Sequence, residues 1–152
     1  MTRKEIAMDY FAQGYNCCQA VVLAYQDMFD LDRLTIEKLT SSFGGGIGRM
    51  REVCGACSAM FMVAGILYGT GESFSHEDKA SHYSRIQELA EKFKAQHDTM
   101  ICRELLKELP VTSTPEPEKR TEKYYNARPC IRFVRTAAEI LDDYINNDPP
   151  QK

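Results

Sequence analysis

The sequence predicts an all-α protein, built as a compact helical bundle of about six to seven helices around a central apolar helix. Strand signals are poor, because β-branched residues are scattered and no alternating apolar and polar run is framed by hairpin turns. Apolar residues instead recur at helical spacing along the chain. The segment 54–68 is apolar on every side, which is typical of a buried central helix.

The N-terminal part of the chain predicts three helices with recognisable ends. Residues 3–13 form one apolar face, and Gly14 terminates this helix. Asn16 is a favourable N-cap for a largely buried helix from Cys17 to about Phe29. A short helix is expected over 32–39.

The later helices are also marked by caps. The run Ser75-His76-Glu77-Asp78 has the form of a capping box that opens a long amphipathic helix. Thr99 is a candidate cap for a short helix over 100–109. Pro129 occupies a first-turn position before an amphipathic helix from Cys130 to Ile145.

We expect a single domain over residues 1–152. The chain is 43% hydrophobic, which provides enough apolar material for one core. Residues 110–118 contain three prolines and predict a surface loop, not a linker, because the part that follows is too short to fold alone. The tail 146–152 is expected to fray.

Composition argues against several classes of function. The net charge is −3, so we expect no nucleic-acid partner. The first residues include acidic side chains and no long apolar core, unlike a signal peptide, and this predicts a cytoplasmic protein. The longest apolar stretch, 53–68, is interrupted by small residues and is shorter than the roughly 20 residues of a membrane span, so none is expected.

Hydrolase and histidine-metal chemistry have no support in the sequence. No Ser-His-Asp order, paired carboxylate motif or HExxH motif occurs. His76 and His82 are six residues apart and so do not share a helical face, and His97 is distant from both. We therefore assign no metal to the histidines.

Cysteine content is the main clue to function. Six cysteines are unusual for an intracellular chain of this size, where they more often bind metal or act in redox chemistry than form a static disulfide framework. Four of them fall in the predicted first turn of a helix: Cys17, Cys54, Cys102 and Cys130. The helix macrodipole favours a thiolate at that position. The alternative is that each is a small buried hydrophobe.

The spacing of these four cysteines matches no local metal motif. The separations of 37, 48 and 28 residues differ from those of zinc fingers and ferredoxins, in which short loops bring two ligands together. A joint site must therefore be assembled by tertiary structure, with one cysteine from each helix, as in other helical bundles.

Four stretches of the sequence resemble a known family. They are Gly14-Tyr15-Asn16-Cys17, the run from Phe43 to Ala56, Ile101-Cys102-Arg103-Glu104-Leu105, and Cys130 with Phe133-Val134-Arg135. In this order, over roughly residues 10–145, the sequence resembles the C-GCAxxG-C-C family of redox-active proteins. The family's four cysteines map onto the same four positions that the helix starts select.

The resemblance implies a small redox-active domain, associated with electron transfer and an iron–sulfur centre, and it supplies no established reaction. The sequence departs from the family in two ways. The central motif runs Cys54-Gly55-Ala56, which is not the order in the family's name, and Ala59 replaces its closing glycine. The added methyl group narrows a close helix contact, but the set of four cysteines is intact.

The two remaining cysteines lie outside the family pattern. Cys54 and Cys57 form a CxxC at a helix start, an arrangement in which a low-pKa thiolate exchanges with a resolving thiol one turn later. No βαβ pattern surrounds it, so the thioredoxin context is missing, and Cys57 as a buried core residue is the alternative. Cys18 is expected to be a packed free thiol, because a vicinal disulfide with Cys17 would be strained.

The glycine-rich loop before Cys54 is interpreted as a backbone support for the site. It has no preceding strand and no following Lys-Ser/Thr, and Arg49 stands where a dinucleotide fingerprint needs glycine. We expect the backbone to approach Cys54 closely and to offer N–H groups to a sulfur or bound anion at Gly44, Gly45, Gly46, Gly48 and Gly55. Nearby arginines are expected to lower thiol pKa values, unless they are solvated surface residues: Arg49, Arg51 and Arg103.

Three functions remain open at this stage. In the first, the four cysteines hold a [2Fe–2S] cluster or another thiophilic metal for electron transfer. In the second, the same cysteines act without metal in a thiol–disulfide oxidoreductase or redox sensor, with Cys57 as a candidate resolving thiol. The third is a structural zinc domain or interaction module, although a domain of ~150 residues folds without a metal. A redox partner protein of unknown identity is expected, and the small residues of the central helix are compatible with a homodimer.

Overall fold

The computed structural model describes residues 1–71 and 75–151, and this part of the chain is all-α, as predicted. It contains eight α-helices, two short 3-10 helices and no strand. The α-helices are α1 (Arg3–Ala12), α2 (Cys17–Leu23), α3 (Arg33–Thr40), α4 (Gly55–Tyr68), α5 (His76–His97), α6 (Cys102–Leu105), α7 (Glu122–Ala127) and α8 (Cys130–Asn147).

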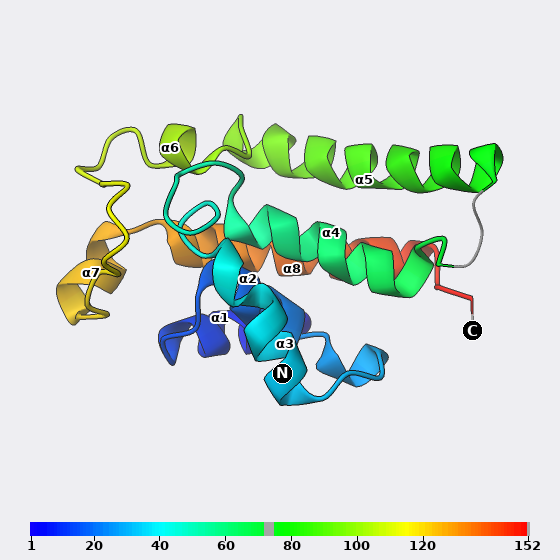
Figure 1. Ribbon diagram of the computed structural model, residues 1–152, viewed down its shortest axis with the longest axis horizontal. Coiled ribbons are helices and arrows are strands. Elements are labelled where there is room, and N and C mark those ends of the chain that lie inside the picture. Colours follow the sequence, from blue (N-terminus) through cyan, green and yellow to red (C-terminus); the bar gives the residue numbers. More distant parts are fainter. Residues whose placement is uncertain (72–74, 152) are drawn as a thin grey trace.

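The apolar helix α4 and the C-terminal helix α8 form the centre of the bundle. Helix α5 runs along both of them, and α1 and α2 pack on the other side (Figure 1). The N-terminal half of α4 is buried, but Ile66 near its end is 41% exposed. Tyr25 is fully buried between these layers, and its hydroxyl donates to the Ala138 carbonyl of α8 at 2.7 Å. The N-terminal helices are therefore joined to α8 by both packing and a buried hydrogen bond.

The expected N-cap of α2 is present. The Asn16 side chain accepts from the Gln19 N–H at 2.8 Å, and the Gln19 side chain accepts from the Asn16 N–H at 3.0 Å, which completes a capping box. Helix α2 ends at Leu23, however, and a 3-10 turn over Gln26–Met28 replaces the end of the predicted helix.

The helix expected over 100–109 is wrong in both its length and its cap. Helix α6 has four residues, and the Thr99 hydroxyl instead accepts from the Ile101 N–H and donates to Glu104. The reason is a tertiary contact: Val53 and Ile101 form an isolated antiparallel bridge. Residues 100 and 101 are extended because they pair with the segment that leads into α4.

The C-terminal part differs from expectation at two places. Helix α7, capped by Thr121, was not predicted, so the described chain has one or two more helices than expected. Helix α8 continues to Asn147, and Tyr68 donates to the Asp148 carbonyl at 2.6 Å, so the first residues of the predicted frayed tail are held in place. Residues 110–118 form an irregular, mostly exposed segment, as predicted, and are called the strap below.

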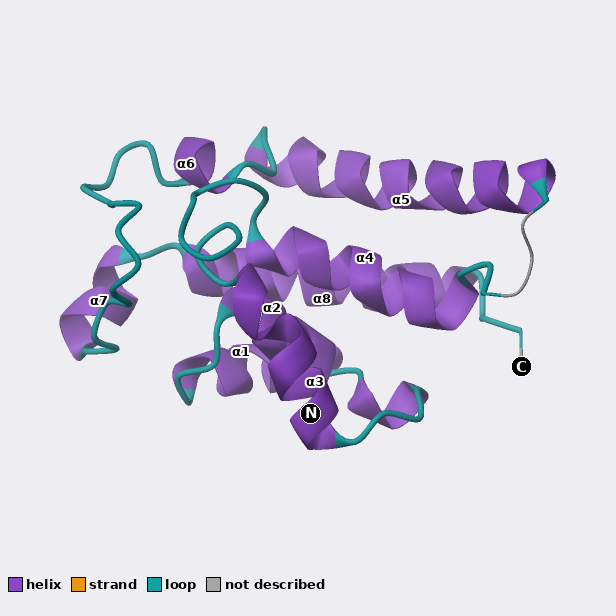
Figure 2. Cartoon of the chain, viewed as in Figure 1, coloured by secondary structure: helices purple, strands orange, loops and turns teal. Residues whose placement is uncertain are grey.

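The loop between α3 and α4 coils back on itself before it enters α4 (Figure 2), and six of its residues have a left-handed backbone conformation. Positive φ angles occur at Gly45, Gly46 and Gly48, and also at Ile47, Arg49 and Arg51. A left-handed conformation costs a residue with a side chain roughly 1–2 kcal/mol, so the surroundings must hold this loop in place. Its own carbonyls accept several of its N–H groups, including that of Glu52, which donates to Gly46 at 2.8 Å.

Glycine is required in this loop because of close packing against two cysteine-bearing segments. A Cβ atom on Gly46 would lie 2.6 Å from the Cβ of Cys102, and one on Gly44 would lie 2.7 Å from the Cβ of Asn16. Gly55 faces the same constraint, because its Cβ would lie 2.7 Å from the Phe43 carbonyl oxygen. The loop therefore approaches Cys102 and the start of α2 as well as leading to Cys54.

The loop provides a matched pair of substitutions that separates packing from backbone strain. Gly46→Ala adds a methyl group both to a left-handed residue and to a filled space, so we expect a loss of about 2–5 kcal/mol in unfolding free energy. Gly48→Ala meets open space at a similar φ and should cost only about 1–2 kcal/mol. Urea unfolding followed by circular dichroism checks both values, and equal losses would contradict this account of the loop.

Candidate functional site

The structure brings four cysteines together around one small cavity. Its volume is about 50 Å³, and its lining includes Cys17, Cys54, Cys102 and Cys130, together with Gly45, Gly46, Gly55, Arg51, Arg120, Tyr124 and Arg128. Each cysteine stands at the start of a different helix: Cys17, Cys102 and Cys130 are the first residues of α2, α6 and α8, and Cys54 occupies the N-cap position of α4.

Backbone hydrogen bonds fix Cys54 and Cys102, each of which follows one residue of the Val53–Ile101 bridge. The Cys54 N–H donates to the Met100 carbonyl at 2.8 Å, and the Cys102 N–H donates to the Glu52 carbonyl at 2.6 Å. These two bonds together make up the isolated Val53–Ile101 bridge. The two cysteines are thus positioned by the main chain and do not depend on side-chain packing alone.

Cys17 and Cys130 form a hydrogen-bonded pair of sulfurs. The Cys17 thiol donates to Cys130, and this bond is the largest cause that lowers the pKa of Cys130 to about 7. The nearby Arg128 and Arg120 guanidiniums act in the same direction, against burial. The same bond and burial raise the pKa of Cys17 well above its usual value. Cys130 is therefore the thiolate of the pair, and Cys17 is its proton-bearing partner.

Cys54 and Cys57 form a second pair of this kind. A hydrogen bond from the Cys57 thiol lowers the pKa of Cys54, and backbone N–H groups at the start of α4 add to the effect. Burial, followed by the hydrogen bond to Cys54, raises the pKa of Cys57 strongly. Cys57 is fully buried and is not part of the cavity lining, so it meets the cavity only through Cys54.

The other two cysteines remain thiols. Burial raises the pKa of Cys102, although Arg51 lies 3.8 Å from its sulfur and opposes the shift. Burial also raises the pKa of Cys18 to about 12, and its sulfur lies 3.7 Å from that of Met62 in the core. The expectation that all four helix-start cysteines have thiolate character is therefore too broad, since it fits only Cys54 and Cys130. At Cys17 the hydrogen bond to Cys130 and then desolvation outweigh the helix start, and at Cys102 desolvation does so.

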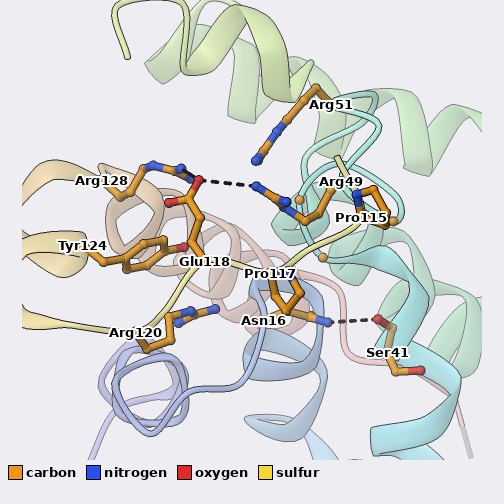
Figure 3. Close-up of a pocket in the computed structure, with 13 residues that line it drawn as sticks. Asn16, Ser41, Arg49, Arg51, Pro115, Pro117, Glu118, Arg120, Tyr124 and Arg128 are labelled. Atoms are coloured by element: carbon orange, nitrogen blue, oxygen red, sulfur yellow. Dashed lines mark hydrogen bonds and ion pairs between the residues drawn. The ribbon is translucent and has the colours of Figure 1, made fainter. Parts of the chain in front are cut away.

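A second, larger cavity lies beside the cysteines, under the strap. It has a volume of about 280 Å³, and its lining includes Gly44, Gly45, Gly48, Arg49, Arg51, Glu118, Arg120, Tyr124 and Arg128 (Figure 3). Arg103 lines neither cavity: it is exposed and pairs with Glu52 at 3.0 Å. The loop glycines thus contribute to both cavities, whereas Arg103 is a surface residue.

Sequence reasoning missed the side of the site contributed by α7 and its flanks. Arg120, Tyr124 and Arg128 line both cavities and recur every four residues, which is a helical spacing. Arg128 also stands two positions before Cys130. These two signals indicate helix α7, which was overlooked because it follows a proline-containing segment.

The arrangement does not form a ready-made metal site. All-thiolate ligation suits iron–sulfur and zinc centres, so the chemistry of the four cysteines is suitable. Across residues 1–71 and 75–151, however, no three His, Cys, Asp or Glu side chains are grouped so that they could hold a metal ion. The donor set thus fits a thiophilic metal in chemistry but not in placement.

The fold and the site define a small all-helical protein with a cysteine-lined cavity. A family model described as "Putative redox-active protein (C_GCAxxG_C_C)" matches residues 15–144, and the chain belongs to this family. No curated protein and no solved structure matches the chain. No helix in the described part of the chain is long and apolar enough to span a membrane.

The Cys17–Cys130 pair predicts a specific titration. Cys17→Ala removes the hydrogen-bond donor, so the pKa of Cys130 should rise from about 7 toward its ordinary value of 9. Cys17→Ser keeps an O–H donor and should leave the titration near 7. Thiolate absorbance at 240 nm, measured against pH without oxygen and compared with a matched Cys130→Ser protein, isolates this group. Identical midpoints in the Ala and Ser variants would contradict the assigned hydrogen bond.

Proposed function

We propose that the protein is a redox protein in which Cys17 and Cys130 cycle between a dithiol and a disulfide. The observation that carries this proposal is that Cys17 and Cys130, from the starts of two different helices, line one small cavity, and that the pKa of Cys130 is lowered whereas that of Cys17 is raised. A low-pKa thiolate is the attacking group in thiol–disulfide exchange, and a neighbouring thiol resolves the product.

The proposed reaction balances with a disulfide as the oxidant. The Cys130 thiolate attacks one sulfur of the substrate, so a Cys130–substrate disulfide forms and the other half of the substrate leaves as a thiolate. That thiolate takes the proton of Cys17, and the Cys17 sulfur then attacks Cys130 and releases the second half. The protein gains one disulfide, and the substrate becomes one thiol and one thiolate, which takes a proton from solvent. A dithiol of a redox partner protein would restore the reduced state.

Residues around the pair support this role. Arg128 and Arg120 stabilise the Cys130 thiolate, and Tyr124 covers the same side of the cavity. The small volume excludes bulk water, which strengthens the interaction between thiolate and guanidinium. The cycle needs cysteines that are kept reduced, so we propose a reducing compartment such as the cytoplasm. A homodimer stays a prediction.

A metal centre is the second candidate function. It is favoured by the convergence on one cavity of Cys17, Cys54, Cys102 and Cys130, two of which have lowered pKa values. These four side chains would hold a [2Fe–2S] cluster or zinc, and a bound cluster would supply one-electron transfer. In both candidate functions, the Cys57 thiol keeps its proton and stabilises the Cys54 thiolate. In the dithiol function, a Cys54–Cys57 disulfide competes with the Cys17–Cys130 disulfide.

Disulfide mapping tests the proposal directly. The anaerobically purified, reduced protein is treated with one equivalent of a small disulfide, trapped with acid and digested. We expect a Cys17–Cys130 linkage in the wild type and in Cys18→Ala, which alters a neighbouring core thiol outside the cavity lining. Cys17→Ser should stop at a mixed disulfide on Cys130. A Cys54–Cys57 linkage in its place would overturn the assigned pair.

Metal analysis of the same sample separates the two candidates. The dithiol proposal expects a colourless protein with less than stoichiometric iron and zinc. Visible absorption bands with about two irons per chain, lost in Cys54→Ser, would instead establish the cluster. Stoichiometric zinc without redox activity would point to the structural alternative.

A further inference from the structure

Four arginines converge on the cavity under the strap. Arg49 and Arg51 come from the left-handed loop, and Arg120 and Arg128 flank α7 (Figure 3). Glu118 is the only acidic residue in the lining, so the cavity has an excess of three positive charges. Such an excess in a partly enclosed space attracts a small anion.

Glu118 occupies the position where an anion would bind. Its carboxylate forms an ion pair with Arg128 and lies 3.4 Å from Arg49. The side chains of Arg128 and Arg49 are only 9% and 13% exposed, whereas that of Glu118 is 38% exposed. Two nearly buried guanidiniums thus share one carboxylate that comes from an exposed segment. Buried guanidiniums require a negative partner, and an incoming carboxylate can replace this one.

The other two arginines are fixed by neighbouring groups. Arg120 donates to the Tyr15 carbonyl at 3.1 Å and stacks 4.5 Å from the Phe11 ring and 4.9 Å from the Tyr124 ring. Arg51 donates to the Thr112 carbonyl at 3.0 Å and faces the Cys102 sulfur. The positive charges are therefore held in place before any ligand arrives, which lowers the cost of binding.

The anion cavity and the cysteine cavity share one wall. The residues common to both linings are Asn16, Gly45, Arg51, Arg120, Tyr124 and Arg128. A molecule anchored by a carboxylate between Arg49 and Arg128 thus has its other end beside the cysteines. The larger cavity, at about 280 Å³, is near the lower limit of small-molecule sites.

We propose that the substrate is a small disulfide with a carboxylate group, and that this carboxylate displaces Glu118 from Arg49 and Arg128. That the substrate is a disulfide rests on the proposed function. That the substrate carries a carboxylate rests on the arginines alone. Cys130 attacks the substrate sulfur and Cys17 resolves the mixed disulfide, so that one half leaves as a thiol and the other as a thiolate that takes a proton from solvent. Glu118 then returns to the two guanidiniums.

Rates of oxidation with three disulfides test the charge preference. The reduced protein is mixed at low salt with 3,3′-dithiodipropionate, neutral 2-hydroxyethyl disulfide or cationic cystamine, and each rate is divided by that of the same disulfide with dithiothreitol. We expect the dianion to exceed the neutral compound by about tenfold, the factor that one charge-assisted hydrogen bond provides. Arg49→Gln should abolish this ratio, and the exposed Arg135→Gln should preserve it.

A binding measurement with compounds that cannot react with thiols tests this inference separately from the proposed function. Calorimetry uses Cys130→Ser with suberate, which has methylene groups in place of the two sulfurs, and with neutral 1,8-octanediol. Suberate alone should bind, and Glu118→Gln should tighten its binding because the competing carboxylate is gone. No suberate binding, or equal rates with all three disulfides, overturns the anion site even if the Cys17–Cys130 disulfide forms. Suberate binding supports the site even if that disulfide does not form.

Discussion

The left-handed loop between α3 and α4 is the constraint on which the rest of the site depends. Six residues with positive φ turn the chain so that Gly44 lies against Asn16 and Gly46 lies against Cys102. The same loop ends in the Val53–Ile101 bridge, whose hydrogen bonds fix the backbone N–H groups of Cys54 and Cys102. The conformational cost of the loop is offset by its own hydrogen bonds and by this packing. The loop thus brings Cys54 and Cys102 to the cavity that Cys17 and Cys130 line from the starts of α2 and α8.

Burial separates the roles of chemically identical thiols. Each of two sulfur pairs has one member that holds its proton and one that gives it up, because a single hydrogen bond favours one thiolate and burial disfavours two. Arg128 and Arg120, which flank α7, then favour the thiolate form of Cys130. The helix starts alone do not produce this asymmetry, since Cys102 also begins a helix and its pKa is raised.

The parts of the fold that sequence reasoning could predict are those set by neighbouring residues. The Asn16 cap and the start of α8 at Cys130 follow from local rules, and the buried N-terminal half of α4 follows from its apolar composition. The length of α6 could not be predicted, because a bridge to a segment 48 residues away keeps residues 100 and 101 extended. The partner of Cys17 was equally inaccessible, since Cys17 and Cys130 are adjacent only in three dimensions, whereas the pairing of Cys54 with Cys57 follows from their CxxC spacing.

Arg49 joins two parts of the molecule that otherwise have separate tasks. Its backbone belongs to the left-handed loop, while its side chain donates to the carbonyls of Thr114 and Glu116 in the strap and pairs with Glu118. The strap is therefore fastened to the same loop that packs on Cys102. A displacement of the strap would therefore also act on the backbone that packs against Cys102, which couples the cover of the larger cavity mechanically to one wall of the cysteine cavity.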